Sequence, residues 1–134
     1  MSSAVAKKVR PKYLSLRALL FEIRQPVPAW VSILHRISGA LLVLPFAAWL
    51  LYLLDLSLAS PESFARLASY LELPLVKLGM LVFIWAYCHH LCAGIRFLLL
   101  DLNAGIALAP ARRSAAAVLV ASLLLTAFFG AKLW

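Results

Sequence analysis

The stretch ISGALLVLPFAAWLLYLLDLSL, Ile37–Leu58, decides the fold class. Its only charged side chain is Asp55, near the end of the run. About 20 consecutive apolar residues are enough for a helix to cross a bilayer. Pro28 is a natural helix opener. Pro45, inside the run, is tolerated in membrane-spanning helices and often marks a kink. The stretch therefore predicts a membrane-spanning helix over about residues 29–58.

Two further apolar runs predict a second span over about residues 74–100 and a third over about 114–133. A polar loop with a short helix is expected over 57–69, and a short connector over 101–114. Hydrophobic residues make up 65% of the 134-residue chain and charged residues 13%, whereas about 25% of residues are charged in a soluble domain. This composition excludes a disordered chain and a water-soluble globule. The expected fold is all-α, a polytopic membrane domain of three helices over residues 29–134.

Positive charge gathers before the first span. The chain has 13 Lys and Arg against 5 Asp and Glu, and most of these cations lie in an arm, residues 1–28, or open the first span. Arg112 and Arg113 lie in the second loop. By the positive-inside rule, the N-terminus and this loop face the cytoplasm or mitochondrial matrix. We therefore interpret the positive charge as a signal for membrane orientation and not as a nucleic-acid-binding patch. Apolar residues from Tyr13 to Ile23 fit a short amphipathic surface segment or an irregular arm packed on a partner.

One polar cluster lies at the start of the first span. At 3.6 residues per turn, Ser32, His35, Arg36 and Gly39 fall on one narrow face of the helix. The face offers a hydroxyl, an imidazole and a guanidinium, with open space at the glycine. Arginine is suited to carboxylates, so the face suits an anionic or carbonyl ligand, such as a haem propionate or a quinone. The alternative is that Arg36 only snorkels to the interface and anchors the helix.

The second polar cluster is a pair of adjacent histidines, His89 and His90, inside the second span. Neutral imidazole is a common axial ligand of haem iron. Neighbouring residues point about 100° apart on a helix, so both cannot serve one site. Small residues, Ala86 and Gly94, lie one turn either side of His90, whereas Trp85 would obstruct a flat ring near His89. The geometry favours His90, and the alternative is a histidine hydrogen-bonded between helices.

Several motifs of soluble enzymes are absent from the sequence. It contains no glycine-rich phosphate loop, no H-E-x-x-H and no cysteine ladder for iron–sulfur clusters. We therefore expect no soluble-substrate chemistry from this chain alone. A single histidine also cannot ligate both faces of a haem, so a partner chain is expected to supply a sixth ligand where one is needed.

The two clusters give the sequence a family resemblance. It resembles the cytochrome-b membrane-anchor subunit of succinate dehydrogenase, the larger of two small anchors. The segment 32–39 is similar to that family's S-x-L-H-R-x-S-G signature, and 90–101 to its H-x-x-x-G-I-R-x-x-x-x-D signature. Arg10-Pro11 followed by Tyr13-Leu14 is similar to its opening R-P-x-x-L, and the loop 60–64 agrees. Two departures are an extra histidine, His89, and Phe97 where a histidine often stands.

The resemblance implies roles for individual residues. His90 would be the axial ligand of a b-type haem, with the other axial histidine supplied by the second small anchor. Ser32, Ile33 and Arg36 would border the quinone site. The positions implied to lie near the haem or its propionates are His35, Arg36 and Gly94.

The resemblance also implies a complex. Its partners would be the second anchor, an iron–sulfur subunit and a flavoprotein subunit, with FAD and the iron–sulfur clusters confined to those partners. Electrons from succinate would reduce ubiquinone or menaquinone in the bacterial inner membrane, or in the mitochondrial inner membrane of a eukaryote. Alternatives are the anchor of a quinol:fumarate reductase, a small oligomeric multi-span transporter, and a structural anchor that has lost its haem.

Overall fold

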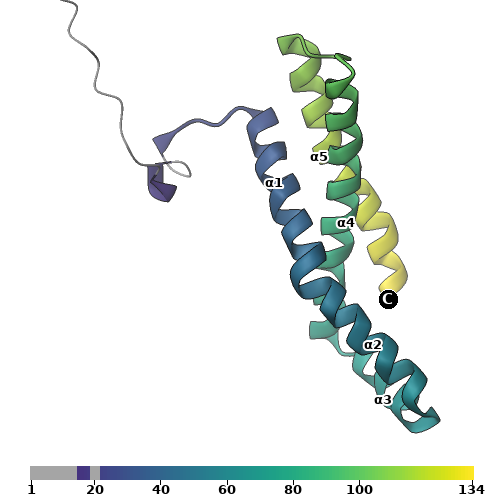
Figure 1. The fold of residues 1–134 in the computed structure, drawn as a ribbon. Coiled ribbons are helices and arrows are strands. Elements are labelled where there is room, and N and C mark those ends of the chain that lie inside the picture. Colours follow the sequence, from purple (N-terminus) through teal and green to yellow (C-terminus); the bar gives the residue numbers. More distant parts are fainter. Residues whose placement is uncertain (1–14, 19–21) are drawn as a thin grey trace, which may run out of the picture.

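The computed structural model describes residues 15–18 and 22–134, and every regular element in this part of the chain is a helix (Figure 1). The helices are α1 (Val27–Leu41), a π-helical turn (Leu42–Phe46), α2 (Ala47–Ala59), α3 (Pro61–Leu71), α4 (Pro74–Asp101), α5 (Leu108–Gly130) and a 3₁₀ turn (Ala131–Leu133). Three continuous stretches are long and apolar enough to cross a membrane: Val27–Ala59, Pro74–Asp101 and Leu108–Leu133. The predicted all-α fold with three spans is confirmed.

The irregularity predicted at Pro45 takes the form of a π-helical turn, Leu42–Phe46, between α1 and α2. Proline has no N–H to donate, and its ring collides with the preceding turn of an α-helix. A single wide turn inside an otherwise continuous helix is the usual form of a π-bulge. The first span therefore continues through Pro45.

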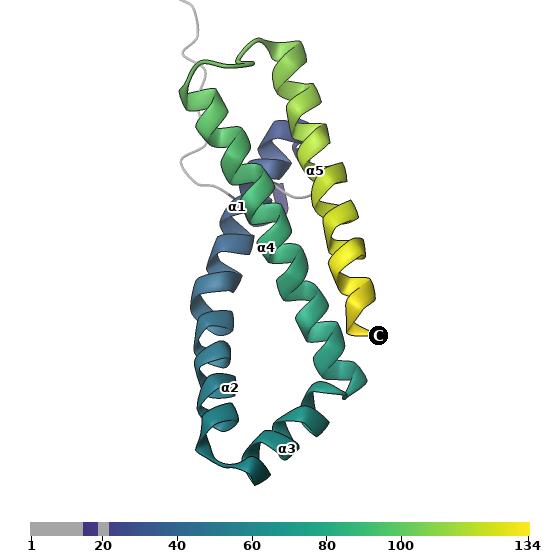
Figure 2. The same cartoon turned by 90° about the vertical axis from the view of Figure 1, so that its right-hand side faces the viewer.

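The helices pack together at one end of the molecule and separate at the other (Figure 2). α1, α4 and α5 form a three-helix bundle, and the hydrophobic residues of its core are small: Val31, Ala93, Ala115 and Val118. Small residues allow close approach of helices in membranes. Below the bundle, α2 runs away from α4, and α3 bridges their ends. The polar clusters of α1 and α4 thus lie in the tightly packed half.

The short helix expected in the first loop is α3, and its first turn is capped. The Ser60 hydroxyl accepts from the Ser63 N–H at 3.1 Å, and the Ser63 hydroxyl accepts from the Ser60 N–H at 3.0 Å. This reciprocal pair is a capping box. The Ser63 hydroxyl also lies 2.6 Å from the Leu56 carbonyl oxygen, to which it can donate. These bonds hold α3 against the end of α2.

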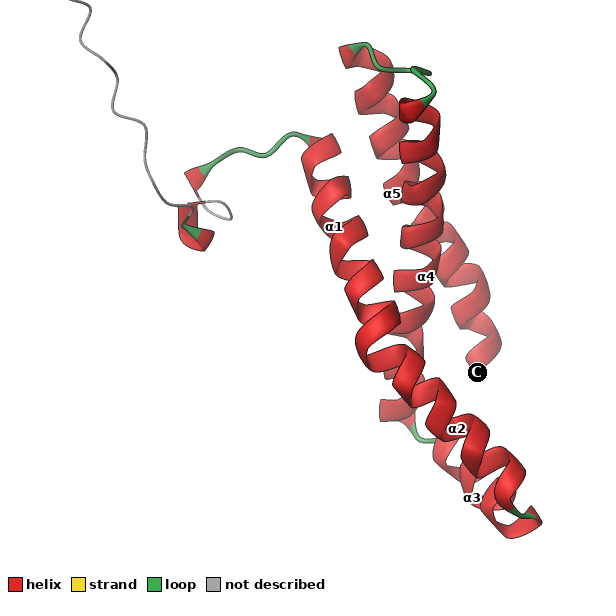
Figure 3. Ribbon diagram, viewed as in Figure 1, coloured by secondary structure: helices red, strands yellow, loops and turns green. Residues whose placement is uncertain are grey.

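The third helix begins at Leu108, earlier than the start expected near residue 114. Pro110 falls in its first turn, where the N–H groups have no partner within the helix. The proline therefore does not interrupt the helix. The connector before it turns through Asn103 and Gly105, with φ of 60° and 75°, and it is one of the few loops among the helices (Figure 3). Most of the predicted amphipathic segment around Tyr13 lies outside the described residues.

Candidate functional site

Two histidines join α1 to α4 in the bundle. The rings of His35 and His90 are stacked, with centroids 4.1 Å apart and 14° between their planes. Phe97, about two turns further along α4, lies tilted against His35, with ring centroids 5.1 Å apart. The sequence placed these histidines in separate clusters, and the fold brings them into contact.

Hydrogen bonds to α1 determine which nitrogen of His90 carries the proton. The Nδ1 atom lies 3.1 Å from the His35 carbonyl oxygen and 3.3 Å from the Ser38 hydroxyl. A carbonyl oxygen can only accept, and the single hydroxyl proton of Ser38 is directed to the same carbonyl, at 2.9 Å. Nδ1 must therefore be the donor. In a neutral imidazole the other nitrogen, Nε2, then keeps a free lone pair.

The free Nε2 atom of His90 forms no hydrogen bond within the described part of the chain. Among the described residues, the only side-chain nitrogen or oxygen that is both fully buried and without a partner belongs to His89. The Nε2 atom of His90 is therefore accessible from outside the bundle. Metal-binding histidines usually donate their second ring N–H to a carbonyl or carboxylate, which fixes the ring for coordination. His90 has this arrangement, because its Nδ1 atom donates to the His35 carbonyl.

Two glycines lie beside the histidine pair, and one of them, Gly39, is required by it. A Cβ atom at Gly39 of α1 would lie 2.8 Å from the Cε1 atom of His90, so no larger residue fits without moving the ring. A Cβ atom at Gly94 of α4 would lie 3.7 Å from the Nε2 atom of His35, an ordinary contact. The space expected beside Gly94 is thus covered by the ring of His35.

His89 occupies a different environment. Its side chain is completely buried, its Nδ1 atom lies 3.4 Å from the Ser122 hydroxyl of α5, and its ring stacks on Trp85 at 5.6 Å. Its Nε2 atom is enclosed and has no hydrogen-bond partner among the described residues. No large planar ligand can reach this ring. Its environment is that of a histidine packed between helices.

The residues predicted to share one face of the first helix separate in the structure. His35 and Gly39 turn toward α4 and contact His90. Arg36 is exposed, and Ser32 and Ile33 are only partly buried. The four residues therefore do not form a single site: His35 and Gly39 lie beside His90 of α4, whereas Arg36 is exposed. The side of α1 that carries the exposed Arg36 and the partly buried Ser32 is called its open flank below.

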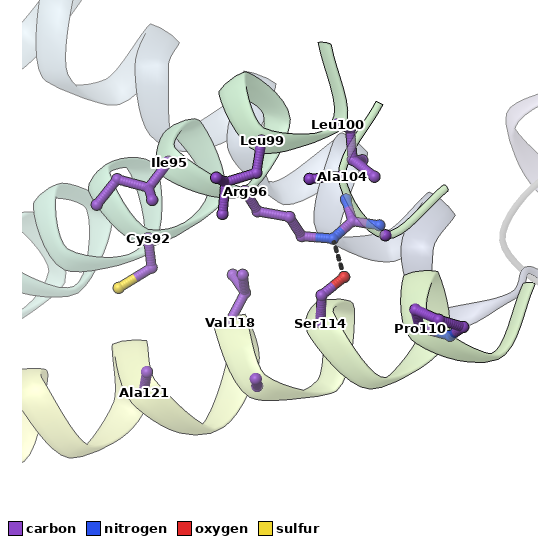
Figure 4. A pocket seen from close by; sticks show the side chains of 12 residues that line it. Cys92, Ile95, Arg96, Leu99, Leu100, Ala104, Pro110, Ser114, Val118 and Ala121 are labelled. Atoms are coloured by element: carbon purple, nitrogen blue, oxygen red, sulfur yellow. Dashed lines mark hydrogen bonds between the residues drawn. The ribbon is translucent and has the colours of Figure 1, made fainter. Parts of the chain in front are cut away.

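Arg96 is the one buried cation of the bundle, at 6% exposure, among the described residues. Its Nε atom donates to the Ser114 hydroxyl at 3.0 Å (Figure 4). A terminal nitrogen donates to the Ala111 carbonyl at 3.2 Å. These bonds tie α4 to the first turns of α5. The sequence places Arg96 in the second span, within the signature of residues 90–101, but does not reveal its partners.

Sequence reasoning missed the roles of two serines. Ser38 supports His90, and Ser122 faces His89. Ser38 stands within the signature of residues 32–39, three positions after His35, and this spacing was an available signal. Ser122 lies in a span rich in alanine and leucine, and no sequence signal pointed to its role.

Comparisons with known proteins agree with the fold. Residues 9–129 match the family described as succinate dehydrogenase/fumarate reductase transmembrane subunit. The succinate dehydrogenase cytochrome b556 subunit of Coxiella burnetii is 36% identical over 126 residues, 93% of this chain and 97% of that protein. The protein of the same name from Rickettsia prowazekii is 31% identical over 102 residues, 75% of this chain and 77% of that protein.

The matched region includes the first two spans, the third as far as residue 129, both histidines of the stacked pair and the buried arginine. Members of this family act as membrane subunits within a succinate:quinone oxidoreductase complex, and the chain by itself is not catalytic toward succinate. The chain belongs to the succinate dehydrogenase/fumarate reductase transmembrane subunit family.

Proposed function

We propose that this chain is the anchor that binds haem b in a succinate dehydrogenase and helps form its quinone-reduction site. The relatives that carry the name cytochrome b556 subunit support haem binding, and their names support succinate oxidation over fumarate reduction. His90 is the proposed axial ligand from this chain. The other axial ligand comes from a second small anchor, because this chain places no second free imidazole opposite it.

The hydrogen bonding of His90 is the observation that carries the proposal. Its Nδ1 proton is directed to the His35 carbonyl, and Nε2 keeps a free lone pair. His89 has no such freedom, because its ring is enclosed between α4 and α5. Of the two adjacent histidines, only His90 is both oriented and accessible. A bound haem b supplies a one-electron carrier within the membrane.

The open flank of α1 is the proposed quinone contact. The Arg36 guanidinium can donate to a quinone carbonyl oxygen from its planar fork, and the Ser32 hydroxyl can donate from one turn away. Ile33 supplies an apolar neighbour. Because Arg36 is exposed in this chain, residues of the second anchor and of the iron–sulfur subunit are proposed to complete the site.

The proposed location is the bacterial inner membrane, or its mitochondrial counterpart. α1 and α5 begin at the same end of the bundle (Figure 1). Arg24 shortly precedes α1 in the sequence, and Arg112 and Arg113 stand in the first turns of α5. By the positive-inside rule this end faces the cytoplasm or matrix. The flavoprotein and iron–sulfur subunits would bind there, close to Ser32 and Arg36, so electrons reach quinone from that side.

A reduced-minus-oxidised visible spectrum of the purified complex tests the proposal. We expect a b-type signal in the native complex, its loss in His90→Ala, and its retention in His89→Gln. The glutamine variant is the matched control, because it removes the neighbouring imidazole and keeps a hydrogen-bonding group for Ser122. A signal lost in His89→Gln and kept in His90→Ala would reverse the assignment.

A further inference from the structure

Arg96 is a buried cation without a counter-ion. Its side chain is 6% exposed, and no carboxylate of the described residues lies within ion-pair distance. The ion pair found in this part of the chain joins Lys77 to Glu72 at the opposite end of α4. Buried charges in proteins are normally paired or bound to a ligand. The missing partner of Arg96 therefore needs an explanation.

The two bonds that Arg96 makes do not use all its donors. Its acceptors are the Ser114 hydroxyl and the Ala111 carbonyl, and both are neutral. A guanidinium has five N–H donors in a fixed fork. Two are used, which leaves three. The bonds to α5 hold the guanidinium in place, and the remaining donors are available to an anion.

An apolar groove between α4 and α5 begins at this guanidinium. Its volume is about 470 Å³, within the range of about 300–1,000 Å³ usual for ligand sites. Figure 4 shows the Arg96 side chain reaching along the groove toward the connector and Pro110. The groove's lining includes Cys92, Leu99, Ala104, Ala117, Val118 and Ala121. The Arg96 guanidinium is thus the one charged group beside a groove that apolar side chains otherwise line.

The groove lies at the basic end of the bundle. Arg96 is five residues before the end of α4 at Asp101, so it lies about 8 Å below that end at 1.5 Å per residue. Arg112 and Arg113 are exposed in the first turns of α5. Asp101, the carboxylate nearest in sequence, is exposed and forms no ion pair within the described residues. Positive side chains therefore outnumber carboxylates near this end of the groove.

We infer that this groove binds one anionic phospholipid. Its phosphate would accept hydrogen bonds from the free donors of Arg96, and one acyl chain would lie in the groove along Val118 and Ala121. A head group at this depth meets the membrane interface, and Arg112 and Arg113 add attraction for anionic lipids. A small soluble anion would not use the apolar walls. The inference is independent of the haem and quinone roles proposed above.

Native mass spectrometry of the whole purified complex tests this inference. The probes are dioleoyl phosphatidylglycerol and, as the zwitterionic comparison, dioleoyl phosphatidylcholine. The native complex should retain one more phosphatidylglycerol than the Arg96→Gln variant, with retention falling about tenfold, the effect of losing charge-assisted hydrogen bonds. Phosphatidylcholine should show no such difference.

A second pair of variants leaves Arg96 unchanged. Ala117 lines the groove, and Ala116 is exposed on α5 outside it. Ala117→Phe should fill the groove and remove the retained phosphatidylglycerol, whereas Ala116→Phe should keep it. Equal retention in both variants, or equal retention of the two lipids, would overturn the inference. Failure of Ala117→Phe alone to assemble would show that a protein partner covers the groove, and would overturn it too.

Discussion

The His90 ring donates from Nδ1 to the main-chain carbonyl of His35, at 3.1 Å, while the two imidazole rings stack at 4.1 Å. One residue of α1 thus fixes both the tilt and the tautomer of one residue of α4. The contact is made inside the three-helix half of the molecule, where small residues bring α1 and α4 together. The packing of the bundle therefore determines how His90 is presented.

Gly39→Ala should displace the His90 ring. The new Cβ would lie 2.8 Å from Cε1, and overpacking of this kind costs about 1–3 kcal/mol. We expect a lower haem-to-protein ratio in the purified complex, measured by pyridine haemochrome. Gly79→Ala is the matched control, because a Cβ there meets no atom within 4 Å. Equal haem content in the two variants would show that His90 tolerates the shift or has no haem to hold.

Ser38→Ala should weaken haem binding without abolishing it. The variant removes one acceptor of the Nδ1 proton and leaves the other, the His35 carbonyl. Loss of a supporting residue behind a metal-binding histidine typically lowers affinity about 10- to 100-fold, and we expect the lower part of that range. Haem release to apomyoglobin measures the change. A release rate as slow as in the native complex would remove Ser38 from the supporting role.

Ser122→Ala should lower stability and leave the haem spectrum unchanged. It removes the hydroxyl near His89, and hydrogen bonds between membrane helices contribute on average about 0.6 kcal/mol. A fall of a few degrees in the apparent Tm is expected, with an unaltered reduced-minus-oxidised spectrum. If the spectrum changed while the Tm did not, His89 would be close to the haem and not a packing residue.

Arg36→Ala should slow quinone reduction without slowing succinate oxidation. We expect succinate-to-quinone activity to fall about tenfold or more, the effect of losing a hydrogen bond from a charged donor. Transfer from succinate to a soluble dye should be unchanged. Ser32→Ala should act in the same direction and more weakly. Arg66→Ala, an exposed arginine of α3, is the control. Unchanged quinone kinetics in Arg36→Ala would exclude it from the site.

Hydropathy and proline positions were sufficient to predict the spans. The run from Ile37 to Leu58 is too apolar for any soluble fold, and the helix expected in the first loop is present as α3. The start of the third helix was placed too late, because Pro110 was read as part of the connector. A proline in the first turn costs no hydrogen bond, so sequence alone did not distinguish the two cases.

The separation of His89 from His90 was partly predictable. Trp85 lies one turn before His89, and the structure stacks the two rings. The contacts across helices were not predictable, because the relative register of two helices depends on how their surfaces pack and not on spacing within either one. The pairing of His90 with Ser38 and of Arg96 with Ser114 depends on that register.

Chemical rescue tests the central claim, that the Nε2 atom of His90 is the axial ligand from this chain, most directly. The measurement is the reduced-minus-oxidised visible spectrum of the complex carrying His90→Gly, recorded before and after imidazole is added. The account predicts that the b-type signal is lost in the variant and returns with imidazole, which restores the missing ligand. A full native signal in the variant without imidazole would contradict the account.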